Sequence, residues 1–80
     1  MNKVLWSSEQ IQEELQRQIN EIREIAEDEA TVVVPLPQEN ELDIAGCNWS
    51  INSIRNGSGY MDDIQRIIRT LQSCVNLKSE

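Results

Sequence analysis

The sequence predicts an α+β fold, with a long N-terminal helix and a C-terminal helix on one face of a small antiparallel three-stranded sheet. Apolar residues recur every three or four positions near both ends of the chain, as in amphipathic helices, and alternate with polar residues in the middle, as in strands. No helical segment separates the predicted strands, so antiparallel pairing is the simplest connection. A chain of 80 residues, of which 39% are hydrophobic, is suited to a single small domain over residues 1–80.

The first predicted helix extends from Ser7 to Ala30. Ser7 and Gln10 have the spacing of a capping box, and Trp6 lies where a hydrophobic staple would place it. Residues 3–6 would form a short strand or an ordered lead-in. The helix has one wide apolar face, which predicts that a second copy covers part of it in a homodimer. This face consists of Ile11, Leu15, Ile19, Ile22, Ile25 and Ala26.

Three short strands are predicted between the two helices. Residues 31–34 are β-branched throughout, and two prolines that follow end this strand. Leu42 and Ile44 alternate with a polar residue and predict a second, half-buried strand. A similar alternation predicts a third strand over residues 48–54.

The last predicted helix extends from about Tyr60 to Asn76, with Ser58 or Gly59 as its cap. Two aspartates in its first turn suit the helix dipole. Its apolar face consists of Met61, Ile64, Ile67, Ile68, Leu71, Cys74 and Val75.

The chain is acidic, with a formal charge of −7 from 14 acidic and 7 basic residues. This charge opposes direct binding to nucleic acid or to an anionic membrane, and it favours a basic surface on another protein. Most of the negative charge lies on the first predicted helix. Mimicry of nucleic acid by rows of carboxylates is a weaker alternative, because Arg17 and Arg23 interrupt the row.

The C-terminal turn of the first predicted helix is the candidate partner-binding site. Glu27, Asp28 and Glu29 crowd a turn where the dipole favours cations, and each exposed misplaced charge costs about 0.3–1 kcal/mol. Together with Glu24, these residues predict a docking surface for Lys or Arg side chains of a partner. The alternative interpretation is a solvated face that serves solubility alone.

A second candidate site, for an anion, is the turn before the last helix. Backbone amides at a helix N-terminus can receive an anion, and Arg55 would add positive charge. The turn lacks the Lys-Ser/Thr ending of a P-loop, so an ordinary turn that leads into a helix is the alternative. The turn consists of Arg55, Asn56, Gly57, Ser58 and Gly59.

Enzymatic chemistry has few candidate groups in this sequence. The chain has no histidine, which excludes Ser–His and Cys–His pairs, and no metal-ligand or cofactor motif, so neither a metal nor a cofactor is predicted. Cys74 is predicted in the core, and Cys47, which follows a glycine, is predicted to be the more exposed and reactive thiol. The sequence has neither a membrane-spanning apolar run nor a signal-peptide pattern, so the expected location is the cytoplasm.

These features predict a small acidic protein-binding module, not an enzyme, that modulates or inhibits a partner by occupying its basic surface. An inhibitor, an immunity or antitoxin-like protein, or a phage-encoded modulator would fit, in a bacterial or phage setting. The alternative is a homo-oligomeric structural protein, or one that binds a small ligand or anion at the Arg55–Gly59 turn.

Overall fold

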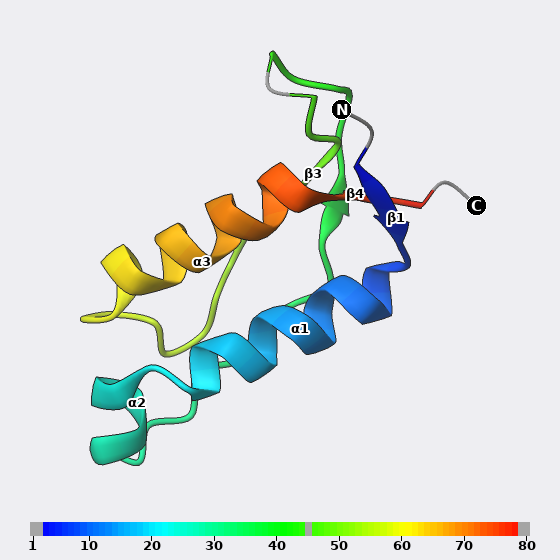
Figure 1. Ribbon diagram of the computed structural model, residues 1–80. Coiled ribbons are helices and arrows are strands. Elements are labelled where there is room, and N and C mark those ends of the chain that lie inside the picture. Colours follow the sequence, from blue (N-terminus) through cyan, green and yellow to red (C-terminus); the bar gives the residue numbers. More distant parts are fainter. Residues whose placement is uncertain (1–2, 45, 79–80) are drawn as a thin grey trace.

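Three helices and four short strands occupy the part of the chain that the computed structural model describes, residues 3–44 and 46–78 (Figure 1). The predicted α+β class is confirmed. Helices α1 and α3 pack side by side, the strands gather near one end of this pair, and α2 lies at the other end (Figure 1). The elements in chain order are β1 (Val4–Trp6), α1 (Ser8–Asn20), α2 (Arg23–Glu27), β2 (Gln38–Glu39), β3 (Trp49–Ser50), α3 (Met61–Cys74) and β4 (Val75–Leu77).

Helix α1 begins as its sequence predicts and buries the predicted face. The Gln10 N–H donates to Ser7 Oγ at 3.2 Å, and the Ser7 N–H donates to Gln10 Oε1 at 2.8 Å. Both bonds of the capping box are therefore present. Ile11, Leu15 and Ile19 are fully buried, because a spacing of four residues puts them on the same side of the helix.

The single long helix predicted up to Ala30 is wrong, because the chain bends between α1 and α2. Ile22 has an extended backbone, with φ −63° and ψ 125°, and precedes the five-residue helix α2. A straight helix would have continued past the start of α3 without a packing partner. The bend instead returns Ile25 to the core, where its exposed fraction is 2%, and leaves Ala26 exposed.

The predicted three-stranded antiparallel sheet is also wrong, since the described strands form two separate two-stranded sheets. β2 and β3 pair antiparallel, with Gln38 opposite Ser50. β1 and β4 pair parallel, with Val4 opposite Val75. The helices therefore do not share one face of a single sheet, and the core lies where α1 and α3 meet the strands.

The predicted strand at residues 31–34 forms only an isolated bridge, between Val33 and Arg55. Glutamine side chains of α1 replace the missing neighbour strand. The Gln16 amide donates to the Val32 C=O at 2.7 Å and accepts from the Val34 N–H at 3.0 Å. Because these side chains satisfy the backbone, Val32 and Val34 are buried without a full sheet around them.

The last helix is shorter than predicted. It ends at Cys74, and the residues up to Leu77 leave it as strand β4. Its N-cap is Tyr60, without a side-chain cap, in place of the predicted Ser58 or Gly59. The parallel partner β1 lies 71 positions earlier in the chain, as the pairing of Val4 with Val75 shows. No local pattern could therefore have revealed this strand.

The two cysteines and the middle strand differ from their predicted environments. Cys47 is buried, with its Sγ 3.2 Å from the Trp49 C=O, whereas Cys74 is exposed where the chain leaves α3. The predicted half-buried strand of Leu42 and Ile44 is a loop, with exposed fractions of 68% and 107%. An Asp43–Cys47 turn draws the cysteine inward and leaves these two apolar side chains outside.

Candidate functional site

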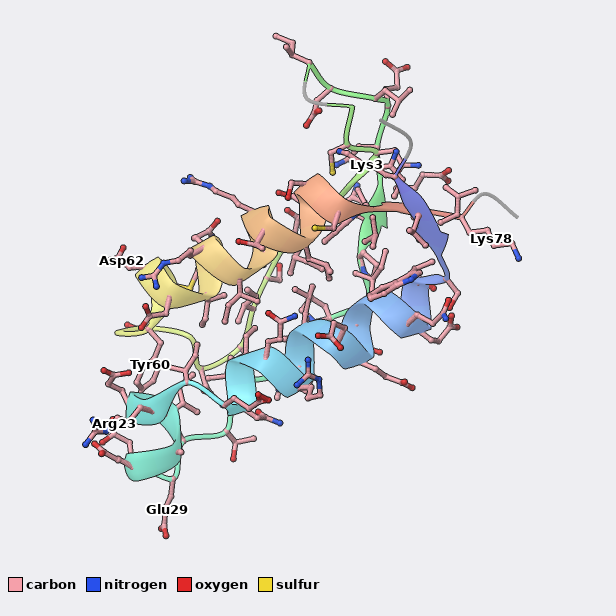
Figure 2. The ribbon with its side chains drawn as sticks, in the orientation of Figure 1. Lys3, Arg23, Glu29, Tyr60, Asp62 and Lys78 are labelled. Carbon is pink, nitrogen blue, oxygen red and sulfur yellow. The ribbon has the colours of Figure 1, made fainter. Side chains whose placement is uncertain are left out.

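The predicted partner-binding residues lie at the end of the molecule where α2 approaches the start of α3. Figure 2 shows Arg23, Glu29, Tyr60 and Asp62 at this end, opposite Lys3 and Lys78. A shallow pocket between α2 and α3 has Glu24 and Asp63 in its lining. We call this region the acidic corner, and it consists of Glu24, Glu27, Asp28 and Glu29 with Asp62 and Asp63 of α3.

Three carboxylates of the acidic corner have partners within the chain. Glu27 pairs with Arg23 at 2.9 Å, and Asp63 pairs with Arg66 at 2.8 Å. Asp28 accepts a hydrogen bond from the Tyr60 hydroxyl at 2.6 Å. The first two pairs lie within α2 and within α3, whereas the bond from Tyr60 to Asp28 joins the end of α2 to the start of α3. All three use part of the charge internally.

The other three carboxylates of the corner are available to a partner. Glu24, Glu29 and Asp62 are exposed, and none of their side chains has a hydrogen bond or ion pair with another described residue. Six carboxylates against Arg23 and Arg66 leave this end with a formal charge of −4. The corner can therefore contribute attraction to cationic side chains.

Glu29 occupies a backbone position that normally suits glycine. Its N–H donates to the Ala26 C=O at 3.3 Å, and the Ala30 N–H donates to the Ile25 C=O at 3.1 Å. These two bonds form a Schellman motif, whose left-handed residue is here Glu29 with φ 54°. A glutamate at this position has both a strained backbone and a negative charge at a helix C-terminus.

The hydrogen bond between α2 and α3 changes the titration of its donor. The bond to Asp28 raises the pKa of Tyr60, and partial desolvation and the charges of Asp28 and Glu24 act in the same direction. Tyr60 is the N-cap of α3 and Asp28 is the C-cap of α2. This single contact therefore links the two helix ends that carry the acidic corner.

The Arg55–Gly59 turn has structural reasons for its residues. Asn56 has φ 61° and donates to the Thr31 C=O at 2.9 Å. Gly57 is buried, and a Cβ there would lie 3.0 Å from Met61 Sδ and 3.3 Å from Ile64 Cδ1. The Arg55 backbone is held in the bridge to residue 33.

The helix that follows this turn begins with carboxylates. Asp62 and Asp63 lie in the first turn of α3, where an incoming anion would have to approach. Their negative charge opposes an anion at these amides. The geometry thus gives the Arg55–Gly59 turn a role in leading the chain into α3.

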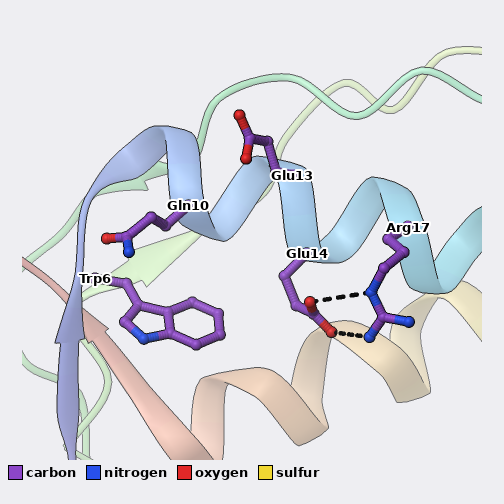
Figure 3. A pocket seen from close by; sticks show the side chains of 5 residues that line it. All are labelled: Trp6, Gln10, Glu13, Glu14 and Arg17. Carbon is purple, nitrogen blue, oxygen red and sulfur yellow. Dashed lines mark hydrogen bonds and ion pairs between the residues drawn. The ribbon is translucent and has the colours of Figure 1, made fainter.

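A pocket of about 340 Å³ lies on the opposite end of α1, beside Trp6 (Figure 3). Glu14 on its wall accepts from Arg17 Nε at 3.2 Å, and this guanidinium, with the Gln18 amide, lowers the pKa of Glu14. Of the two carboxylates that line this pocket, Glu14 is therefore already paired. The pocket is lined by Trp6, Gln10, Glu13, Glu14 and Arg17.

Sequence reasoning located the α2 part of the acidic corner and missed the part from α3. Tyr60 and Asp63 are more than 30 positions from Asp28 and Glu24, so no local pattern connects them. Within residues 3–44 and 46–78 no cluster of three or more potential metal-binding side chains occurs. The helices of this part of the chain are too short or too polar to cross a membrane.

Comparison with protein-family models, with curated proteins and with solved structures gives no match.

Proposed function

We propose that the chain is a small acidic protein-binding module that modulates or inhibits a partner protein by occupying its basic surface with the acidic corner. The proposed role is binding without catalysis, since the sequence has no histidine to serve as a base beside a Ser or Cys nucleophile. The partner surface would carry Lys or Arg side chains that meet Glu24, Glu29 and Asp62.

The observation that supports this proposal most is Glu29. A glycine would remove the strain of its left-handed backbone, and a neutral or basic side chain would suit the helix C-terminus better. Residues that break local preferences without a compensating contact in their own chain often serve function. The Glu29 side chain forms no hydrogen bond or ion pair within the part of the chain that the structure describes.

The proposal can be tested by capture of proteins from a lysate on the immobilised chain, with identification of what binds. The test variant replaces Glu24 and Glu29 with Gln and Asp62 with Asn, three exposed carboxylates without internal partners. A control variant replaces Glu13, Glu39 and Glu41 with Gln, which removes the same charge elsewhere on the surface.

The proposal predicts that wild type and control retain a basic protein that the corner variant releases. Retention should weaken as salt increases, because charge attraction between exposed groups is screened. Equal capture by the corner variant and the control would contradict the proposal, since net charge alone would then explain the binding.

A further inference from the structure

The parallel pair of β1 and β4 has one protected edge and one open edge. At the outer edge of β4, the Asn48 side chain donates to the Leu77 C=O at 3.0 Å and accepts from the Leu77 N–H at 2.7 Å. The Trp49 indole N–H donates to the Val75 C=O at 3.0 Å. Side chains therefore satisfy the outward backbone groups of β4, as a neighbouring strand would.

The outer edge of β1 has no such cover. Lys78 N–H donates to the Trp6 C=O at 2.7 Å, so the backbone groups of Trp6 point toward β4. Successive residues of a strand point their N–H and C=O to alternate sides, so those of Leu5 point away from β4. No other strand pairs with β1 among the described residues, and Val4 and Leu5 are each 59% exposed.

We infer that the open edge of β1 pairs with β1 of a second copy of this chain, antiparallel and about a two-fold axis at Leu5. In this register the N–H and C=O of Leu5 exchange two hydrogen bonds with Leu5 of the second copy. Val4 then lies opposite Trp6, and Lys3 lies opposite Ser7. The contact between the two β1 strands would join the β1–β4 pair of each copy into one four-stranded sheet.

The shape of the edge favours a second copy over an extended strand of another protein. The Ser7 N–H already bonds to Gln10, so the edge ends there and Leu5 is the central residue that can offer both groups. When Leu5 meets Leu5 of a second copy, the N–H and C=O of each residue bond to the C=O and N–H of the other. A two-fold axis makes this contact self-complementary. On the Ser7 side of Leu5, a longer foreign strand would gain no bond to the Ser7 N–H, which already donates to Gln10.

Charge also permits this contact in a chain of net charge −7. The strand Val4–Trp6 carries no charged residue, and the acidic corner lies at the far end of the molecule (Figure 2). The carboxylates that share a pocket with residues of this region are Glu13 and Glu14, beside Trp6, and Asp43, beside Lys3, and Glu14 is paired with Arg17. Two copies joined at β1 therefore keep their most negative ends apart.

This surface replaces the one that the sequence predicted for self-association. The stripe of α1 is covered by its own chain, with Ile11, Leu15 and Ile19 at 0% exposure. The β1 edge is shorter than a standard interface, so we expect a weak dimer that dissociates on dilution. The edge contact is independent of the acidic corner and of any partner.

Sedimentation equilibrium of the purified chain, over roughly 10 μM to 1 mM, tests the inference. The average mass of the wild type should rise toward twice the mass of one chain. Leu5→Lys should remain monomeric throughout, because a lysine on an edge strand disfavours pairing. Leu36→Lys is the matched control, since Leu36 is 51% exposed and is not part of β1, and it should dimerise like the wild type.

A second measurement does not depend on a variant. The backbone amide resonance of Leu5 in the wild type should shift with concentration, and its hydrogen exchange should slow at least severalfold, while that of Val33 should not change. A wild type that stays monomeric at the highest concentration would overturn the inference. Equal dimerisation of Leu5→Lys and Leu36→Lys would overturn it as well, because the contact would then lie elsewhere.

Discussion

Replacing Glu29 with glycine tests whether this residue is retained against the stability of its own fold. Glu29 is the left-handed residue of the Schellman motif that ends α2, with φ 54°. Relief of the left-handed strain should stabilise the fold by about 1–2 kcal/mol. Removal of a negative charge from a helix C-terminus should add about 0.3–1 kcal/mol, and the greater freedom of glycine in the unfolded chain should subtract about 0.4–1 kcal/mol.

The expected net effect is a stabilisation of roughly 1 kcal/mol, which for a domain of this size raises the melting temperature by about 4–8 °C. A thermal melt followed by circular dichroism at low ionic strength measures it. Glu29→Gly should at the same time weaken capture of the basic partner, because the corner loses one of its carboxylates without an internal partner.

Two matched variants separate the contributions to this change. Glu29→Gln removes the charge alone, so its gain should be small and should disappear at high salt. Ser53→Gly removes left-handed strain alone, because Ser53 is exposed, has φ 60°, and its side chain bonds to no other described residue. Its gain should not depend on salt. A melting temperature of Glu29→Gly at or below that of the wild type, with Ser53→Gly raised, would refute the reasoning about Glu29.

Three further changes test other parts of the structure. The pKa of Tyr60, the only tyrosine of the chain, is raised by its bond to Asp28, so this bond should stabilise the fold fully below pH 10 and lose its effect as pH rises through the folded pKa. An ultraviolet titration should show the phenol ionising at lower pH in Asp28→Ala, and an unchanged curve would mean that the bond is absent. Cys74 should react with a thiol reagent rapidly and Cys47 only on unfolding, as mass spectrometry of single-cysteine variants would show, and the reverse order would contradict the burial of Cys47. Gly57→Ala should destabilise the fold by about 1–3 kcal/mol in chemical denaturation, because the new Cβ overpacks a buried site, and a neutral effect would mean that the site can relax.

The sequence by itself determined the features that depend on neighbours a few positions apart. The capping box joins Ser7 and Gln10, which are three positions apart, and the buried face of Ile11, Leu15 and Ile19 follows from helical spacing. The run of acidic residues at the end of the first predicted helix could also be read from the sequence. Its position at a helix C-terminus holds in the structure, although the helix is the short α2.

Tertiary structure alone decided how the strands are satisfied. The extended residues 31–34 look like a strand, but glutamine side chains of α1 take the place of a neighbour, as Gln16 does at Val32. Val75 continues a helical pattern, but it becomes a strand because β1 offers it a parallel partner. In both places the competing contact comes from a distant part of the chain, and its energy exceeds the local preference.

The candidate site divides in the same way. The sequence places Glu24, Glu27, Asp28 and Glu29 together, since they lie within six consecutive positions. Only the packing of α2 against α3 adds Asp62 and Asp63 to them, and only the tertiary structure brings the Tyr60 hydroxyl to Asp28. The charges of a chain can be counted from its sequence. Which of them lie close together on the surface depends on how helices more than 30 residues apart pack, because Coulomb attraction and screening act through space.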